Sequence, residues 1–279
     1  MHASLEAVLH ADMQTCQQTI LHSRMHAYLL SCWLPCYWIY GFSGTKPPGR
    51  GQRGEEAKVI YSFTNSKGGV GKSTLAVHLV LWLVRQGRSV ALIDADAQGS
   101  SSIWLQEASP ETPVFRWLSA DDILDGVPAL RDQFEFVVAD GPAGLSEVTR
   151  TIMFLTDATF LPIGPSVLDL RAVTEAVRVV RQVQAIRQGP PRAMIVPNKV
   201  QARTRLSREL LETAHAFGLP TATGLRLRQC YADAAGQGKV VWQMGPQAAD
   251  AARDMESLLE EMVGYGRAAK NDEPGLAAC

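Results

Sequence analysis

The sequence predicts an α/β fold in which a mainly parallel sheet carries helices on both faces. From Lys58 onward, short apolar runs alternate with longer segments of helical character, as expected for successive strand and helix units. The apolar runs are continuous, which is typical of strands buried on both faces. With 279 residues, 46% of them hydrophobic and 20% charged, the chain can form one substantial globular core.

The expected elements follow one another in chain order. Strands are expected where the apolar runs occur, at residues 59–64, 89–94, 134–140, 158–163 and 192–197. Helices are expected at residues 73–84, 170–187, 207–217 and 247–264. The last helix carries its apolar residues at amphipathic spacing, which indicates packing against the core.

The first strand leads directly into a glycine-rich turn, and a helix follows. A strand, a glycine-rich turn ending in Lys-Ser and a helix form the context that a phosphate-binding P-loop requires. Backbone N–H groups and the helix N-terminus favour a phosphate there. Lys72 is expected to reach the β- and γ-phosphates, and Ser73 to hold Mg²⁺. The expected nucleotide-binding residues of this loop are Lys67, Gly68, Gly69, Val70, Gly71, Lys72, Ser73 and Thr74.

The loop departs from the usual P-loop spacing at one position. Ser66 stands where the first glycine is expected, and a second lysine, Lys67, follows it. A second ammonium group beside the phosphates makes sense as a clamp on developing phosphoryl charge. This clamp would act either within its own subunit or on the nucleotide of a partner subunit.

Three carboxylates follow the predicted strands. Asp94 and Asp96 end one strand, and Asp140 ends another. Ligands in open α/β sheets bind at the carboxyl ends of strands, so these acids are expected to face the P-loop. One carboxylate can hold the metal while another orients or deprotonates the attacking water. We expect Ser73 and Asp140 at the metal and Lys67 and Lys72 in catalysis, with Asp94 and Asp96 dividing the metal and the attacking water between them.

These motifs together resemble those of the deviant Walker A ATPases of the ParA/MinD type, over residues 58–264. Lys67 stands at the signature-lysine position. Residues 94–99 resemble the switch I segment, in which the second acid is the hydrolytic one, with Ala97 where many members carry proline. This likeness implies Asp94 for the metal and Asp96 for the attacking water. Residues 140–142 are similar to switch II. The resemblance implies a P-loop NTPase fold and an ATPase that uses ATP and Mg²⁺.

The later part of the chain extends this resemblance. Residues 196–200 resemble the strand end where an Asn contacts the adenine base, here Asn198. Residues 226–236 resemble a late segment of small plasmid-partition ATPases. The family implies that ATP closes a homodimer, which binds DNA without sequence preference. A centromere-binding or cargo adaptor protein then stimulates hydrolysis and releases it. A cytoplasmic, nucleoid-associated partition ATPase is therefore expected.

A DNA-binding surface would have to be local, because the formal net charge is −1. Five arginines late in the chain are candidates: Arg203, Arg205, Arg208, Arg226 and Arg228. They could line a phosphate-binding surface. The alternative is a solvated helix face, on which Arg208 pairs with Glu212 at i,i+4 spacing.

The sequence also bears on three functions other than DNA partition. A nitrogenase iron-protein function would need cysteines at residues 94–165, and the sequence has none there. A MinD-like membrane-cycling ATPase would end in a basic amphipathic helix, and the short tail at residues 266–279 contains a proline. Stable membrane association is therefore not expected, but a MinD-like membrane-cycling ATPase stays an alternative if the apolar stretch at residues 28–42 supplies the anchor. An ATPase that positions a protein or conjugation-complex cargo remains open.

Residues 1–57 differ in composition from the rest. Their longest apolar stretch, residues 28–42, is too short to span a bilayer, and a basic Gly/Pro linker follows it. A membrane anchor, a partner-binding arm and a stretch outside the functional protein are the alternatives. We favour the last, because the strand after Lys58 begins as a domain's own start would. The ATPase domain is expected at residues 58–265 and a disordered tail at 266–279.

Overall fold

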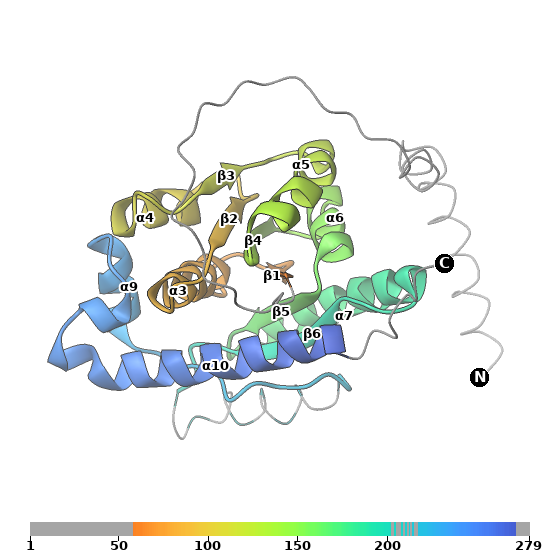
Figure 1. Ribbon diagram of the computed structural model, residues 1–279. Helices are drawn as coiled ribbons and strands as arrows, with labels where there is room; N and C mark the ends of the chain where they lie inside the picture. Colours follow the sequence, from red (N-terminus) through yellow and green to blue (C-terminus); the bar gives the residue numbers. More distant parts are fainter. Residues whose placement is uncertain are drawn as a thin grey trace, which may run out of the picture. The chain divides into compact units, whose positions relative to one another are not determined.

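The computed structural model describes residues 58–271, apart from residues 202, 203, 205–207, 209, 211, 213, 215 and 216. Six strands form one sheet in the order β3-β2-β4-β1-β5-β6 (Figure 1). Every neighbouring pair is parallel. The strands are β1 (Val59–Asn65), β2 (Val90–Asp94), β3 (Val114–Arg116), β4 (Phe136–Ala143), β5 (Ala158–Ile163) and β6 (Arg192–Pro197). The predicted parallel sheet is confirmed.

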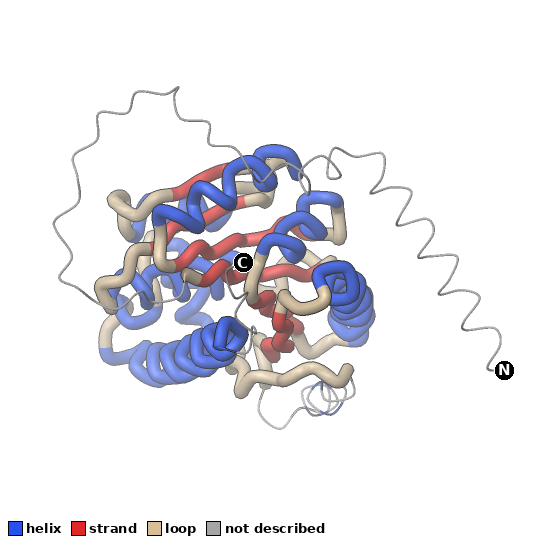
Figure 2. Tube along the Cα trace, turned by 45° about the vertical axis from the view of Figure 1, so that its right-hand side comes forward, coloured by secondary structure: helices blue, strands red, loops and turns tan. Residues whose placement is uncertain are grey.

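Helices cover both faces of the sheet, as predicted (Figure 2). One face carries α3 (Lys72–Arg85), α4 (Ser100–Ala108), α9 (Gln229–Gly236) and α10 (Ala249–Asn271). The other carries α5 (Ala120–Gln133), α6 (Glu147–Leu155) and α7 (Val167–Arg187). The pleat of β1 explains the division, because alternate side chains point to opposite faces. Tyr61 and Phe63 join the core around α3 and α10, whereas Ile60 joins the core around α5 and α6.

Several elements were not expected from the sequence. The edge strand β3 has three residues, which is too short for a periodic pattern to be recognised. Helices α4, α5, α6 and α9 also went unpredicted. Two short 3₁₀ helices, η1 (Val241–Gln243) and η2 (Pro246–Ala248), precede α10. The expected helix at residues 207–217 lies only partly within the described residues, of which 208, 210, 212 and 214 are helical.

The helix expected at residues 247–264 is longer than predicted, because α10 continues to Asn271; the domain boundary at residue 265 stays a prediction. Side chains of the last turns of α10 pack onto the sheet. The Tyr265 hydroxyl donates to the Ala193 carbonyl at 3.0 Å, and the Arg267 guanidinium lies 5.2 Å from the ring centre of Phe136. These contacts hold the last turns of α10 in place. Residues 1–57 and 272–279, for which an extension and a tail were predicted, lie outside the described residues.

A buried histidine anchors α3, the helix that follows the P-loop. His78 Nδ1 lies 2.7 Å from the Thr74 carbonyl, and Nε2 lies 3.2 Å from the Val241 amide nitrogen. Burial lowers the pKa of His78 to about 4, so the ring is neutral near pH 7. A neutral ring that accepts from the Val241 N–H at Nε2 must donate to Thr74 from Nδ1. His78 is thus a structural residue that ties α3 to the segment before α10.

Within residues 58–271, as far as they are described, no helix is both long and apolar enough to cross a lipid bilayer.

Candidate active site

The glycine-rich loop joins β1 to α3 at the carboxyl edge of the sheet. Gly71 begins α3 with a φ of 100°, a left-handed conformation that side chains disfavour. A Cβ at this position would lie 2.1 Å from Asn198 Nδ2, so a larger residue cannot be accommodated. Among the described residues no side chain caps α3, and its first turn carries no acid. Its N-terminal N–H groups therefore remain available to an anion.

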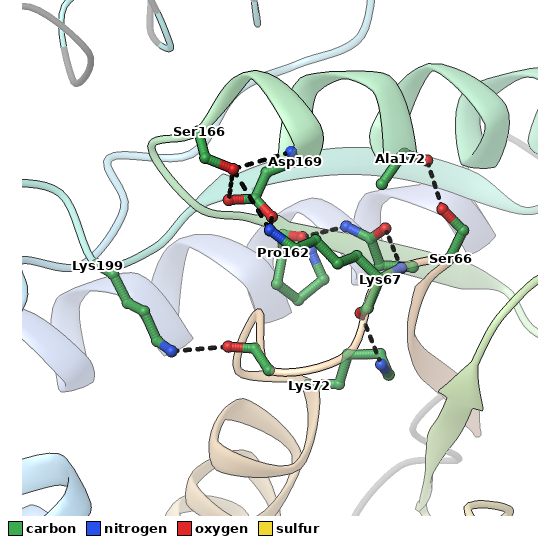
Figure 3. A network of polar contacts seen from close by, with 10 residues as sticks. Ser66, Lys67, Lys72, Pro162, Ser166, Asp169, Ala172 and Lys199 are labelled. Atoms are coloured by element: carbon green, nitrogen blue, oxygen red, sulfur yellow. Dashed lines mark hydrogen bonds and ion pairs between the residues drawn. The ribbon is translucent and has the colours of Figure 1, made fainter.

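Three side chains hold the carbonyl groups of this loop, and Figure 3 shows two of them, Lys72 and Lys199. Lys72 Nζ donates to the Lys67 carbonyl at 3.3 Å, and Lys199 Nζ donates to the Gly69 carbonyl at 2.7 Å. Asn198 Nδ2 donates to the Val70 carbonyl at 2.8 Å. None of these three bonds uses an N–H group of the loop, so they fix its shape and leave those donors for phosphate. The bond from Asn198 uses one of the two N–H groups of its amide, so it does not conflict with the predicted adenine contact. That contact stays a prediction.

The start of the loop is tied to α7 (Figure 3). The Ser66 hydroxyl, at the position of the missing glycine, donates to the Ala172 carbonyl at 3.1 Å. Lys67 Nζ forms an ion pair with Asp169 Oδ1 at 2.5 Å, and its side chain is 38% exposed. Lys67 is therefore held at the first turn of α7. Its predicted phosphate contact would require it to leave Asp169.

Lys72 lies deep in the site. The residue is 6% exposed, and burial lowers its pKa, while the charges of Asp140 and Asp96 act in the opposite direction. A lowered pKa means that the negative charges nearby do not fully offset the cost of burying the ammonium group. Lys72 is therefore suited to a strongly anionic ligand such as a phosphate chain.

Asp140 is the carboxylate that the fold leaves unsatisfied. It is fully buried, and within the described part of the chain neither of its oxygens accepts a hydrogen bond. Burial raises its pKa to about 7, against the effects of the nearby Ser73 and Ser101 hydroxyls and of Lys72. A buried carboxylate beside the Ser73 hydroxyl provides the hard oxygen ligands that Mg²⁺ prefers. The residues present therefore fit the metal predicted for this position.

Asp94 has a different role from Asp140, although the two are paired in register on β2 and β4. Asp94 Oδ2 accepts hydrogen bonds from the Ser102 N–H and hydroxyl, at 2.8 and 2.5 Å. Its Oδ1 accepts from the Asp96 N–H at 3.1 Å. Both oxygens are thus used to fix the start of α4 and the turn before it. Asp140 has no such bonds from the described residues, and the predicted metal role of Asp94 stays a prediction.

Asp96 lies on a tight turn between β2 and α4. Its carbonyl accepts from the Gly99 N–H at 2.9 Å, and its Oδ1 accepts from the Gln98 N–H at 3.0 Å. The turn follows the carboxyl end of β2, so Asp96 is near the P-loop as predicted. Its charge acts on Lys72. The predicted role of Asp96 with water remains a prediction.

Sequence reasoning missed four residues of this site. Ser101 is buried beside Asp140, and its hydroxyl acts to lower the pKa of that carboxyl group. Asp169 follows the helix-capping Ser166 by three positions, a spacing that could have indicated it. Lys199 directly follows Asn198, but its left-handed backbone, with a φ of 58°, gives no sequence signal. Arg116 ends the unpredicted strand β3.

The five candidate DNA-binding arginines are not all placed. Arg203 and Arg205 lie outside the described residues. Arg208 and Arg226 are exposed, whereas Arg228 forms an ion pair with Asp254 on α10 at 2.8 Å. The predicted contact of these five arginines with DNA stays a prediction.

The parallel sheet and its glycine-rich loop define a P-loop nucleotide-binding protein. Residues 61–241 match the CobQ/CobB/MinD/ParA nucleotide binding domain. The chain belongs to this family, and it is an ATPase of the ParA/MinD type.

Similar proteins include two relatives and one solved structure. The chain is 30% identical over 210 residues to the maintenance of carboxysome distribution protein A of Halothiobacillus neapolitanus, covering 72% of this chain and 95% of that protein. It is 29% identical over 168 residues to the chromosome partitioning protein ParA of Caulobacter vibrioides, covering 45% and 63%. The ATP complex of a Cyanothece McdA variant shares the fold, with a TM-score of 0.61 at 16% identity and coverage of 75% and 95%.

Proposed function

We propose that the chain is a Mg²⁺-dependent partition ATPase. In this proposal it dimerises on ATP, binds DNA without sequence preference, and hydrolyses ATP when a partner protein stimulates it. The observation that carries the proposal is the composition of one site. It combines an open helix N-terminus, two lysines in the loop and the buried, unsatisfied carboxylate of Asp140.

The side chains divide the work as follows. Ser73 and Asp140 would hold Mg²⁺, which supplies charge neutralisation at the phosphates when bound. Lys72 binds the phosphate chain from its buried position. Asp96 orients the attacking water and takes its proton. Lys67 leaves its ion pair to contact phosphate, in its own subunit or across the dimer, which couples nucleotide state to dimerisation.

We propose two candidate cargoes for this cycle. The sequence favours plasmid or chromosomal DNA, served by a centromere-binding partner in the cytoplasm at the nucleoid. A protein body with its own adaptor is the second candidate. The similarity to a carboxysome distribution protein over 95% of that protein's length favours it. Nucleotide-gated DNA binding is the step to test first, because the partition proposal requires it and its absence would favour the second candidate.

DNA co-sedimentation tests the gate directly. We expect binding with ATP at low salt, weaker binding at moderate salt, and none with ADP. The salt dependence follows from phosphate contacts by arginines such as Arg208 and Arg226. Asp96→Ala is expected to bind DNA with ATP at least as well as the unaltered protein, because it blocks hydrolysis and leaves the ATP state intact.

Two outcomes would contradict the proposal that the bound nucleotide controls DNA binding. DNA binding of equal strength with ATP and with ADP would show that nucleotide does not control it. ATP hydrolysis without DNA binding in any state would favour direct positioning of a protein cargo or a membrane cycle.

We also propose that the ATPase domain is complete without residues 1–57. A protein that starts at Lys58 is expected to bind a fluorescent ATP analogue with the affinity of the full chain, within about threefold. The physical reason is that β1 begins at Val59 and that all the site residues placed above lie beyond it. An insoluble product, or a tenfold loss of affinity in a soluble one, would contradict this boundary.

A further inference from the structure

The turn that carries Asp96 is a β-turn with alanine at its second position. The Gly99 N–H donates to the Asp96 carbonyl at 2.9 Å, which makes Asp96 position i, Ala97 position i+1 and Gly99 position i+3. Aspartate at i and glycine at i+3 are favoured residues of β-turns, and proline is favoured at i+1. Proline is favoured there because its ring fixes φ near −65°. Ala97 gives the backbone no such restraint.

A side chain from another strand contacts the turn at this point. Arg116 Nη2 donates a hydrogen bond to the Ala97 carbonyl at 3.3 Å. The same guanidinium covers Gly99, whose ideal Cβ position lies 3.0 Å from Arg116 Nη2 and 3.1 Å from its Cζ. Gly99 is buried as a result, although Ala97 and Gln98 beside it are exposed.

The sheet explains why Arg116 reaches this turn. Arg116 is paired in register with Asp94, and the Trp117 N–H donates to the Asp94 carbonyl at 3.2 Å. Along β3 the side chains alternate between faces. Phe115 packs with the core around α5, and Val114 packs with the core that includes α4. Arg116 therefore lies on the face of α4, which begins directly after the turn.

We propose that Arg116 is a positioning residue for hydrolysis: it holds the 96–99 turn in the way a proline at position 97 would. In the protein without nucleotide, this restraint slows hydrogen exchange at the backbone amides of the turn. The catalytic part of this inference rests on the proposed ATPase function. There, Arg116 keeps the Asp96 carboxylate in position beside the P-loop. Arg116 itself contacts the turn and not the reacting atoms.

The first test is hydrogen–deuterium exchange of the nucleotide-free protein, which needs no activity. In Arg116→Ala we expect the Gln98 and Gly99 amides to exchange about three- to tenfold faster, because one hydrogen bond and the cover over Gly99 are lost. Adding Ala97→Pro to Arg116→Ala should return the Gly99 rate to within about twofold of the unaltered protein. Arg150→Ala, an exposed arginine on α6, is the matched control and should change neither rate.

The second test follows ATP hydrolysis in the same variants. Arg116→Ala is expected to lower kcat about tenfold, because Asp96 is no longer held in place, and to leave KM for ATP within about twofold. The Ala97→Pro double variant should recover most of kcat, although proline carries no charge. Arg116→Lys keeps a donor within reach of the Ala97 carbonyl and should lie between Arg116→Ala and the unaltered protein.

Each failure has a distinct meaning. Unchanged exchange in Arg116→Ala overturns the inference, and so does faster exchange with an unchanged kcat. A lower kcat that Arg116→Lys restores and Ala97→Pro does not would show that Arg116 acts through its charge, which also overturns it. If the unaltered protein hydrolyses no ATP, the proposed function fails, and the exchange comparison alone still decides whether Arg116 restrains the turn.

Discussion

Asp140→Asn is expected to stabilise the nucleotide-free protein by about 2–4 kcal/mol at pH 8 while it removes the Mg²⁺ requirement for tight ATP binding. Asp140 is buried and its carboxylate accepts no hydrogen bond from the described residues, so its ionised form is costly. A neutral amide of the same shape avoids that cost. The same change removes the charge that we propose for the metal site.

The pH dependence of this gain has a definite sign. The pKa of Asp140 rises from 3.8 in the unfolded chain to about 7 in the fold. The cost of ionising it in the fold is therefore absent below pH 3.8, grows as the pH rises, and is complete above about 7. Urea unfolding in the presence of a chelator should accordingly show a smaller difference between Asp140→Asn and the unaltered protein at pH 5 than at pH 8.

Asp94→Asn is the matched control for this prediction. Asp94 is equally buried and is paired in register with Asp140, but its two oxygens accept three hydrogen bonds. An asparagine has one carbonyl oxygen, so at least one donor loses its acceptor, at a cost of about 1–3 kcal/mol. The two variants should shift stability in opposite directions. A loss of stability in Asp140→Asn at pH 8 would contradict our account of the site.

Lys72→Ala is expected to weaken binding of a fluorescent ATP analogue by about 30-fold to several thousandfold. This range corresponds to the loss of one partner from a buried charge pair, about 2–5 kcal/mol. Burial lowers the pKa of Lys72, so its charge is costly in the fold, and relief of that cost should offset the loss of its bond to the Lys67 carbonyl. Lys72→Ala should therefore lower the affinity for the ATP analogue while the free energy of unfolding changes little.

The control for Lys72→Ala is Lys239→Ala. Lys239 is a lysine whose ammonium contacts Gln237, away from the loop. It should leave the affinity unchanged. An affinity in Lys72→Ala within threefold of the unaltered protein would show that this loop does not bind the phosphates.

The sequence was sufficient to predict the parallel sheet and the loop, because both depend on local patterns. Continuous apolar runs mark the buried strands, and the Gly-Lys-Ser turn lies between a strand and a helix. The carboxylates could be placed for a related reason, since parallel strands bring their carboxyl ends to one edge of the sheet.

The division of roles between Asp94 and Asp140 could not be predicted. Both follow similar apolar runs, and the difference arises from Ser102, which turns back on Asp94 at the start of an unpredicted helix. The ion pair of Lys67 was also beyond prediction, because Asp169 lies on a different helix. Such contacts depend on how elements pack, which short-range patterns do not specify.

The central place of β1 affects how the protein is made. β1 is the first strand of the sheet to leave the ribosome, yet its neighbours β4 and β5 are translated much later. The Ile60 N–H, for example, binds Asp157, 97 positions further along the chain. Until those strands emerge, β1 is an unpaired apolar strand of the kind that chaperones protect. The phosphate-binding motif is thus among the first parts of the sheet domain to be synthesised, and its site is among the last to be assembled.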